Sequence, residues 1–183
     1  MDRQSKKHKI ERSAKECAYL ATFVALLIAV QLVLSSVAGI ELVTVLMVAY
    51  VFVMGVWRGL VIATCFSLLR TLMFGFFPNI VLLYWTYYSL VAIIFGLLGK
   101  GLKTSNTVTV AVVTACACVS TVLFTLLDDV ITPLYYAYSL DATKAYFFAS
   151  IPVMIPHVIC VGISVAVLFY PLYKTFAYLY KRL

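Results

Sequence analysis

Long runs of residues without a charged side chain most limit what this chain can fold into. The first run covers residues 18–38, and comparable runs recur to the end of the 183-residue chain. Crossing a bilayer as a helix takes about 20 apolar residues, so these runs predict an all-α membrane protein. Only 11% of the residues are charged and 64% are apolar, whereas soluble domains are about 25% charged. This composition excludes an ordinary soluble enzyme and a disordered protein.

Breaks between the runs predict a bundle of six transmembrane helices. Gly, Pro and polar clusters mark these breaks, because Pro cannot continue a helix and Gly favours turns. The breaks are a turn at 57–59, the stretch 75–79, a loop at 99–106 and a longer connection at 128–141. The expected helices cover residues 18–38, 42–56, 60–74, 80–98, 107–127 and 145–173. The last is expected to be kinked by Pro152 and Pro156. These bounds divide the chain into an N-terminal tail (1–17), a six-helix transmembrane domain (18–173) and a C-terminal tail (174–183).

The positions of Lys and Arg predict that both tails are cytoplasmic. With six spans and the N-terminus inside, twelve of the fourteen basic residues fall on inner segments, and only Arg70 and Lys144 lie at outer ends. Such an excess follows the positive-inside rule. A five-span alternative fuses the second and third helices through residues 57–59 and places Lys100 and Lys103 outside, which weakens the bias. The basic start lacks a signal-peptide cleavage pattern, so we expect a retained first helix.

Small residues form a stripe on the first helix. Ala18, Ala21, Ala25 and Ala29 are spaced three or four residues apart, so they share one face and let another helix approach closely. This pattern is typical of a docking face for a partner membrane protein. Packing within the bundle explains it equally directly, and the spacing alone leaves both interpretations open.

Aromatic and polar residues gather at the expected outer end of the fourth helix. Tyr84 and Tyr88 are one turn apart, with Trp85 beside them and Asn79 directly after Pro78. Aromatic rings with polar edges suit a planar or bulky amphiphilic ligand. An aromatic belt at the membrane interface is the alternative for the rings, and capping of the helix is the alternative for Asn79.

Ionisable residues in the last two helices are further candidates for a ligand site. Asp128 and Asp129 are adjacent, and neighbouring helix positions point about 100° apart. We therefore expect one of them to bind a ligand or to pair with Arg70 or Lys144, and the other to be solvated. His157 follows Pro156 inside the membrane, where an imidazole needs a polar neighbour. Arg70 either binds a ligand carboxylate or phosphate, or extends to lipid headgroups.

Motifs of independent catalysis are missing from the sequence. It contains no Walker A motif, no HExxH, no GxSxG and no dinucleotide-binding loop. The five cysteines do not have metal-site spacing. We therefore expect no ATPase or other enzyme activity in this chain, no metal and no cofactor. Because the basic residues mark one side of a membrane protein, we expect contact with lipids and no nucleic-acid binding.

Over residues 15–180 the chain resembles the substrate-binding S components of energy-coupling factor (ECF) type ABC transporters. The Ala-xxx-Ala face of that family's first helix is matched by Ala21, Ala25 and Ala29. The short second helix and the stretches at residues 55–59, 74–78 and 170–174 are also similar to S components. The resemblance implies six helices with both ends cytoplasmic, in the cell membrane of a bacterium.

The resemblance also implies a mechanism. An S component binds a water-soluble vitamin from outside and topples in the membrane together with a transmembrane coupling subunit and two cytoplasmic ATPase subunits. The loop at residues 35–41 would act as the gate. The residue patterns of the riboflavin, thiamine and biotin subfamilies are not seen, and an aromatic-lined mouth suits a corrinoid such as cobalamin as the first candidate. The residues expected to bind the vitamin are Asn79, Tyr84, Trp85, Tyr88, Asp128, Tyr135, Tyr136, Tyr146 and His157.

Two other classes of protein remain alternatives. A stand-alone secondary transporter would use Asp128 or His157 as a proton relay and would need no partner. A membrane assembly protein would bind no small molecule and would tolerate Trp85→Ala and His157→Ala.

Overall fold

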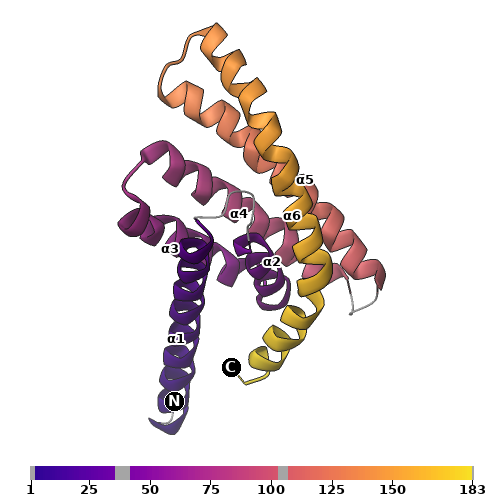
Figure 1. Ribbon diagram of the computed structural model, residues 1–183. Helices are drawn as coiled ribbons and strands as arrows, with labels where there is room; N and C mark the ends of the chain where they lie inside the picture. Colours follow the sequence, from indigo (N-terminus) through magenta and orange to yellow (C-terminus); the bar gives the residue numbers. More distant parts are fainter. Residues whose placement is uncertain (1–2, 36–41, 103–106, 183) are drawn as a thin grey trace.

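The computed structural model describes residues 3–35, 42–102 and 107–182, and the regular elements in these ranges are all α-helices (Figure 1). The prediction of an all-α chain is therefore confirmed. Five of the helices are long and apolar enough to cross a membrane. In the first helix, the segment that meets this criterion runs from Ser13 to Leu34. The helices are α1 (Arg3–Leu34), α2 (Val43–Met54), α3 (Val56–Phe74), α4 (Pro78–Gly101), α5 (Thr107–Tyr135) and α6 (Leu140–Tyr180).

The helix α2 is the exception among the six. It has 12 residues, which at 1.5 Å per residue span about 18 Å, whereas the bilayer core is about 30 Å thick. Its side chains are buried on nearly every side, and Val48, Ala49 and Val51 have no exposed surface. It packs against α6, α4, α3 and α1. The expected second span is therefore a short core helix surrounded by its neighbours.

The break between α2 and α3 lies at Gly55 and not at residues 57–59. Gly55 has φ +87°, a conformation that glycine adopts without the steric cost of a Cβ. Residues 57–59 belong to the first turn of α3, so the predicted turn is wrong by a few positions. The two helices remain separate, in contrast to the fused helix of the five-span alternative.

The last two helices are longer than expected. The predicted connection at residues 128–141 is wrong over most of its length, because α5 continues through Pro133 to Tyr135 and α6 begins at Leu140. Ser139 caps α6, since its Oγ accepts a hydrogen bond from the backbone N–H of Ala142 at 3.3 Å. Helix α6 also continues through its three prolines to Tyr180, and its ribbon is curved (Figure 1).

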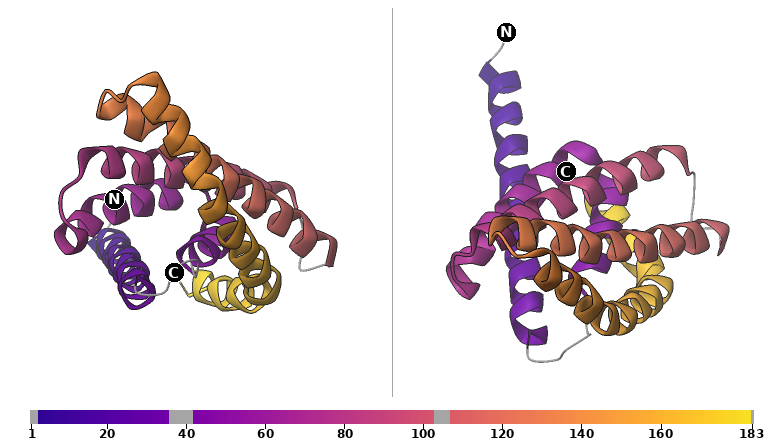
Figure 2. Two further views of the ribbon diagram at one scale, coloured as in Figure 1. Left: turned by 45° about the horizontal axis from the view of Figure 1, so that its top comes forward. Right: turned by 90° about the horizontal axis from the view of Figure 1, so that it is seen from above.

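The helices form two hairpins and a peripheral first helix (Figure 2). Helix α3 packs along α4, and α5 packs along α6, while α1 contacts mainly α3 and α2. Helix α1 already begins at Arg3, inside the predicted N-terminal tail. An aromatic cluster joins α1, α2 and α6: the rings of Phe23 and Tyr50 stack at 4.1 Å, and Phe176 meets them edge-on at 5.5 and 5.4 Å.

Candidate functional site

Side chains from five helices meet around Tyr84, in the second turn of α4. The Tyr84 hydroxyl accepts a hydrogen bond from Gln31 Nε2 of α1 at 3.2 Å. The guanidinium of Arg70 from α3 lies 4.1 Å from the centre of the same ring. On the other side, Tyr84 meets Phe124 of α5 at 5.6 Å, and Phe124 meets His157 of α6 at 6.3 Å. We call Gln31, Arg70, Tyr84, Tyr88, Phe124 and His157 the central cluster.

Three of the predicted site residues, Tyr84, Tyr88 and His157, belong to the central cluster. Tyr88 is only 2% exposed and packs edge-on against Phe66 at 5.3 Å, one turn along α4 from Tyr84. It therefore forms the base of the cluster. Tyr84 and His157 are half-buried, as expected for side chains that line a site between helices.

Of the other members of the central cluster, Gln31 was missed as a site residue, and Arg70 was predicted to bind either a ligand anion or lipid headgroups. The Oε1 atom of Gln31 and the Nε atom of Arg70 are buried, and each lacks a hydrogen-bond partner in the part of the chain that the structure describes. A signal for both was present in the sequence, because an amide or a guanidinium inside an apolar run is a candidate for function. The sequence did not show that Tyr84 brings them together.

A second group of polar side chains joins α4, α5 and α6. Asp128 accepts hydrogen bonds from Thr132 Oγ1 at 2.6 Å and from the Tyr146 hydroxyl at 2.9 Å. Asn79 Nδ2 donates to Thr132 Oγ1 at 3.2 Å. Three of the predicted site residues, Asn79, Asp128 and Tyr146, thus lie in one hydrogen-bond chain, which we call the carboxylate network. Asn79 does not cap α4, since Phe77 is the cap residue and no side chain bonds there.

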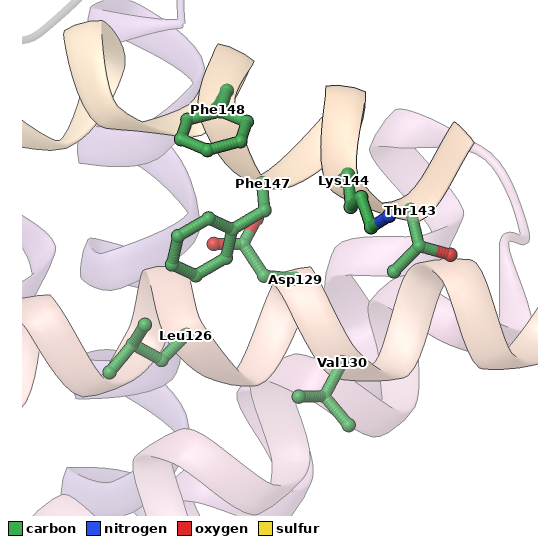
Figure 3. A pocket seen from close by; sticks show the side chains of 7 residues that line it. All are labelled: Leu126, Asp129, Val130, Thr143, Lys144, Phe147 and Phe148. Atoms are coloured by element: carbon green, nitrogen blue, oxygen red, sulfur yellow. The ribbon is translucent and has the colours of Figure 1, made fainter. Parts of the chain in front are cut away.

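Asp129 is buried and not solvated. Its side chain is 6% exposed, and Oδ2 accepts a hydrogen bond from Ser150 at 2.8 Å. Asp129 is therefore not the solvated member of the pair, because α5 continues past both residues and α6 covers Asp129. Figure 3 shows its carboxylate beside Phe147 at a cavity of about 450 Å³. The lining residues of this cavity are Leu126, Asp129, Val130, Thr143, Lys144, Phe147 and Phe148.

The expected pairing of an aspartate at 128 or 129 with Arg70 or Lys144 is also not seen. Lys144 Nζ lies 3.7 Å from Asp141 Oδ1, one turn away on the same helix, and both side chains are exposed. Arg70 lies on the opposite side of Tyr84 from Phe124, the α5 residue of the central cluster. The lengthening of α5 and α6 explains the difference, since each aspartate finds hydroxyl donors on these helices instead.

The remaining predicted site residues lie in two other places. Trp85 is 48% exposed, and its Nε1 donates to Thr64 Oγ1 on α3 at 3.2 Å, so it covers the outside of the α3–α4 hairpin. Tyr135 and Tyr136 lie at the turn between α5 and α6, where about half of each side chain is exposed. Tyr136 stacks on Tyr138 at 6.0 Å, and Tyr138 meets Tyr146 at 6.1 Å. The structure does not bring Trp85, Tyr135 or Tyr136 into the central cluster.

The alanine stripe of α1 faces away from the bundle. Ala18, Ala21, Ala25 and Ala29 are all exposed, whereas Phe23, Val24 and Leu27 on the same helix are at most 5% exposed. At 3.6 residues per turn, Leu27 lies about 200° around the helix from Ala25. Of the gate predicted at residues 35–41, positions 36–41 lie outside the described residues.

Among the side chains described in residues 13–35, 42–102 and 107–182, no group of three or more His, Cys, Asp or Glu could hold a metal ion. The five long apolar helices define an integral membrane protein. Comparisons with models of protein families, with curated proteins and with solved structures found no match to this chain.

Proposed function

We propose that this protein is the S component of an ECF-type ABC transporter. It binds a water-soluble vitamin from outside, and it delivers the vitamin by toppling in the membrane with a coupling subunit and two ATPases. The observation that carries the proposal is the exposed alanine stripe of α1. A membrane helix gains affinity for another helix when small residues let the two backbones approach. The stripe is not used inside this bundle, because Phe23, Val24 and Leu27 make the inward contacts.

The central cluster supports the binding part of the proposal. Binding sites between helices are usually lined by aromatic rings with a few polar groups that fix orientation. Tyr84, Phe124 and His157 supply rings from three helices, while Gln31 and Arg70 supply polar groups from two others. Cobalamin is the first vitamin to test.

The charge distribution supports the orientation in the proposal. If six helices cross the membrane, twelve of the fourteen basic residues fall on the side where both chain ends are expected, which is typical of cytoplasmic segments. We propose the cell membrane of a bacterium as the location.

A bulky residue in the stripe tests the proposal. Mass spectrometry of solutes released from the purified protein first identifies the vitamin. ATP-dependent uptake of that vitamin is then measured in proteoliposomes that contain the coupling subunit and both ATPases. Ala25→Trp is expected to reduce uptake by about tenfold or more, because the indole prevents close helix approach. Vitamin binding by the isolated variant is expected to stay unchanged, since Ala25 faces away from the central cluster.

Val119→Trp on α5 is the matched control, because Val119 is 69% exposed and lies on a different helix. Equal uptake by the Ala25→Trp protein and the unaltered protein would contradict the docking role. Uptake without ATP or partners that is abolished by a protonophore would favour the stand-alone transporter instead. Absence of any bound small molecule would favour an assembly protein.

A further inference from the structure

The half-buried side chain of Arg70 packs against aromatic rings of α3 and α4. It belongs to the last two turns of α3, which ends at Phe74. Its guanidinium carbon lies 4.8 Å from the centre of the Phe74 ring and 4.1 Å from the centre of the Tyr84 ring. Tyr84 in turn contacts α1 through Gln31 and α5 through Phe124. The positive charge is therefore held between α3 and the interior aromatic rings.

This charge has no acidic partner among the side chains described in residues 13–35, 42–102 and 107–182. The four acidic side chains described there all have other partners: Glu16 binds Arg58, Asp141 lies near Lys144, Asp128 bonds to Thr132 and Tyr146, and Asp129 bonds to Ser150. The Nε atom of Arg70 is buried and makes no hydrogen bond within the described residues. Aromatic rings attract a cation, but they accept none of the directed N–H bonds of a guanidinium.

Arg70 is half-buried, and a cation whose buried Nε atom is unpaired is costly unless an anion completes it. A guanidinium presents a planar fork of N–H donors that matches a carboxylate or a phosphate. Next to it, Gln31 holds a buried Oε1 atom that lacks a partner in the described ranges, so a second polar group is available beside Tyr84. Arg70 and Gln31 thus each have an unpaired polar atom to which a polar group of a bound solute would form a hydrogen bond.

We propose that Arg70 binds an anionic group of the transported solute, a carboxylate or a phosphate, beside the ring of Tyr84. The inference rests on the proposed function, because it assigns a substrate class to that same site. Gln31 orients the group through its amide. Phe124 and His157, on the far side of Tyr84, provide the surface for the rest of the solute.

The full-length protein is purified from cells in an uncharged detergent, and the small molecules that it releases on denaturation are quantified by mass spectrometry. The variants are Arg70→Gln, Arg70→Lys and the control Lys144→Gln. The unaltered protein is expected to release one enriched water-soluble solute that contains a carboxylate or phosphate. Arg70→Gln is expected to lower its amount by about tenfold or more, as loss of a charge-assisted hydrogen bond does. Lys144→Gln removes an exposed positive charge and is expected to release the normal amount.

Thermal unfolding of each variant shows whether its fold is kept. If Arg70→Gln does not fold, Arg70→Lys decides, because it keeps the charge but lacks the planar fork. A reduction of about threefold or more at an unchanged unfolding temperature supports the inference, and unchanged release overturns it.

Four further outcomes overturn the inference. The inference is overturned if the enriched solute has no anionic group. It is also overturned if the Arg70→Gln protein releases the solute in the normal amount. Both outcomes leave the proposed function intact. If the molecule whose release depends on Arg70 is a phospholipid, Arg70 binds a lipid headgroup, and the inference of a solute site is overturned. Absence of any enriched solute from the unaltered protein contradicts the proposed function itself, and the inference with it.

Discussion

At the scale of single residues, Asp128 organises the polar contacts between α5 and α6. Thr132 and Tyr146 both donate to its carboxylate, so Asp128→Ala removes the acceptor of two hydroxyl groups in an apolar setting. Leaving buried donors unpaired costs about 1–3 kcal/mol. We expect Asp128→Ala to lower the free energy of unfolding by about that amount, measured by thermal or denaturant unfolding in detergent.

Asp141→Ala is the control for this prediction, because Asp141 forms an exposed pair with Lys144 at 3.7 Å, and exposed pairs contribute about 0–1 kcal/mol. Equal destabilisation by the two substitutions would show that the carboxylate network does not hold the helices together.

The sequence predicted the residue types of the site better than their partners. Tyr84, Tyr88 and His157 were selected because aromatic and ionisable side chains stand out in apolar helices, and they do lie together. Trp85 was grouped with Tyr84 because the two are adjacent, but neighbouring positions on a helix point about 100° apart, and the indole bonds to Thr64. The contact between Gln31 and Tyr84 joins positions 53 residues apart, which no local pattern reveals.

At the scale of the helices, Gly55 fixes the corner between α2 and α3. Its φ of +87° is strained for a residue with a Cβ, and a Cβ there would meet nothing within 4 Å. With ψ 173°, Gly55 lies in a region that only glycine adopts readily, so the cost of Gly55→Ala is a backbone cost of about 1–3 kcal/mol. We expect denaturant unfolding in detergent to show a decrease of that size.

Gly101→Ala provides the comparison for the corner. A Cβ at Gly101 also meets nothing within 4 Å, but Gly101 lies at the end of α4 and does not have positive φ. Its replacement should leave stability unchanged or slightly raised. If the Gly55→Ala and Gly101→Ala proteins have the same free energy of unfolding, the corner at residue 55 tolerates a side chain.

Helix number was predictable from the sequence, whereas helix length was not. Apolar runs and their breaks indicate how many helices form, and the six expected helices are present. The predicted end of α5 at residue 127 was wrong because charged residues were taken to mark the membrane edge. In the structure, hydroxyl groups of α6 donate to Asp128 and Asp129, and α5 continues to Tyr135.

At the scale of the whole molecule, one ion pair connects three helices near the ends of the chain. Arg58 of α3 donates from Nε to Glu16 Oε1 of α1 at 2.6 Å, and its guanidinium lies 5.5 Å from the centre of the Tyr180 ring of α6. The side chains of Arg58 and Glu16 are 23% and 35% exposed, so solvent screens the pair only in part.

A double-mutant cycle with Glu16→Gln and Arg58→Met tests this connection. Directly bonded residues typically show a coupling free energy of about 0.5–3 kcal/mol, and we expect about 1 kcal/mol from unfolding measurements. The second cycle pairs Lys144→Gln with Asp141→Asn, an exposed pair that should give a coupling near zero. Additive effects of Glu16→Gln and Arg58→Met would show that this ion pair does not help to hold α1 on the bundle.

The short length of α2 has a consequence for how the chain enters the membrane during synthesis. A helix of 12 residues is too short to be inserted as an independent span, so we expect α2 to enter the bilayer together with α3, which follows it directly after Gly55. Its surface is then covered by α4 and α6, of which α6 is the last to leave the ribosome. The centre of the bundle is therefore completed only after the whole chain has been made.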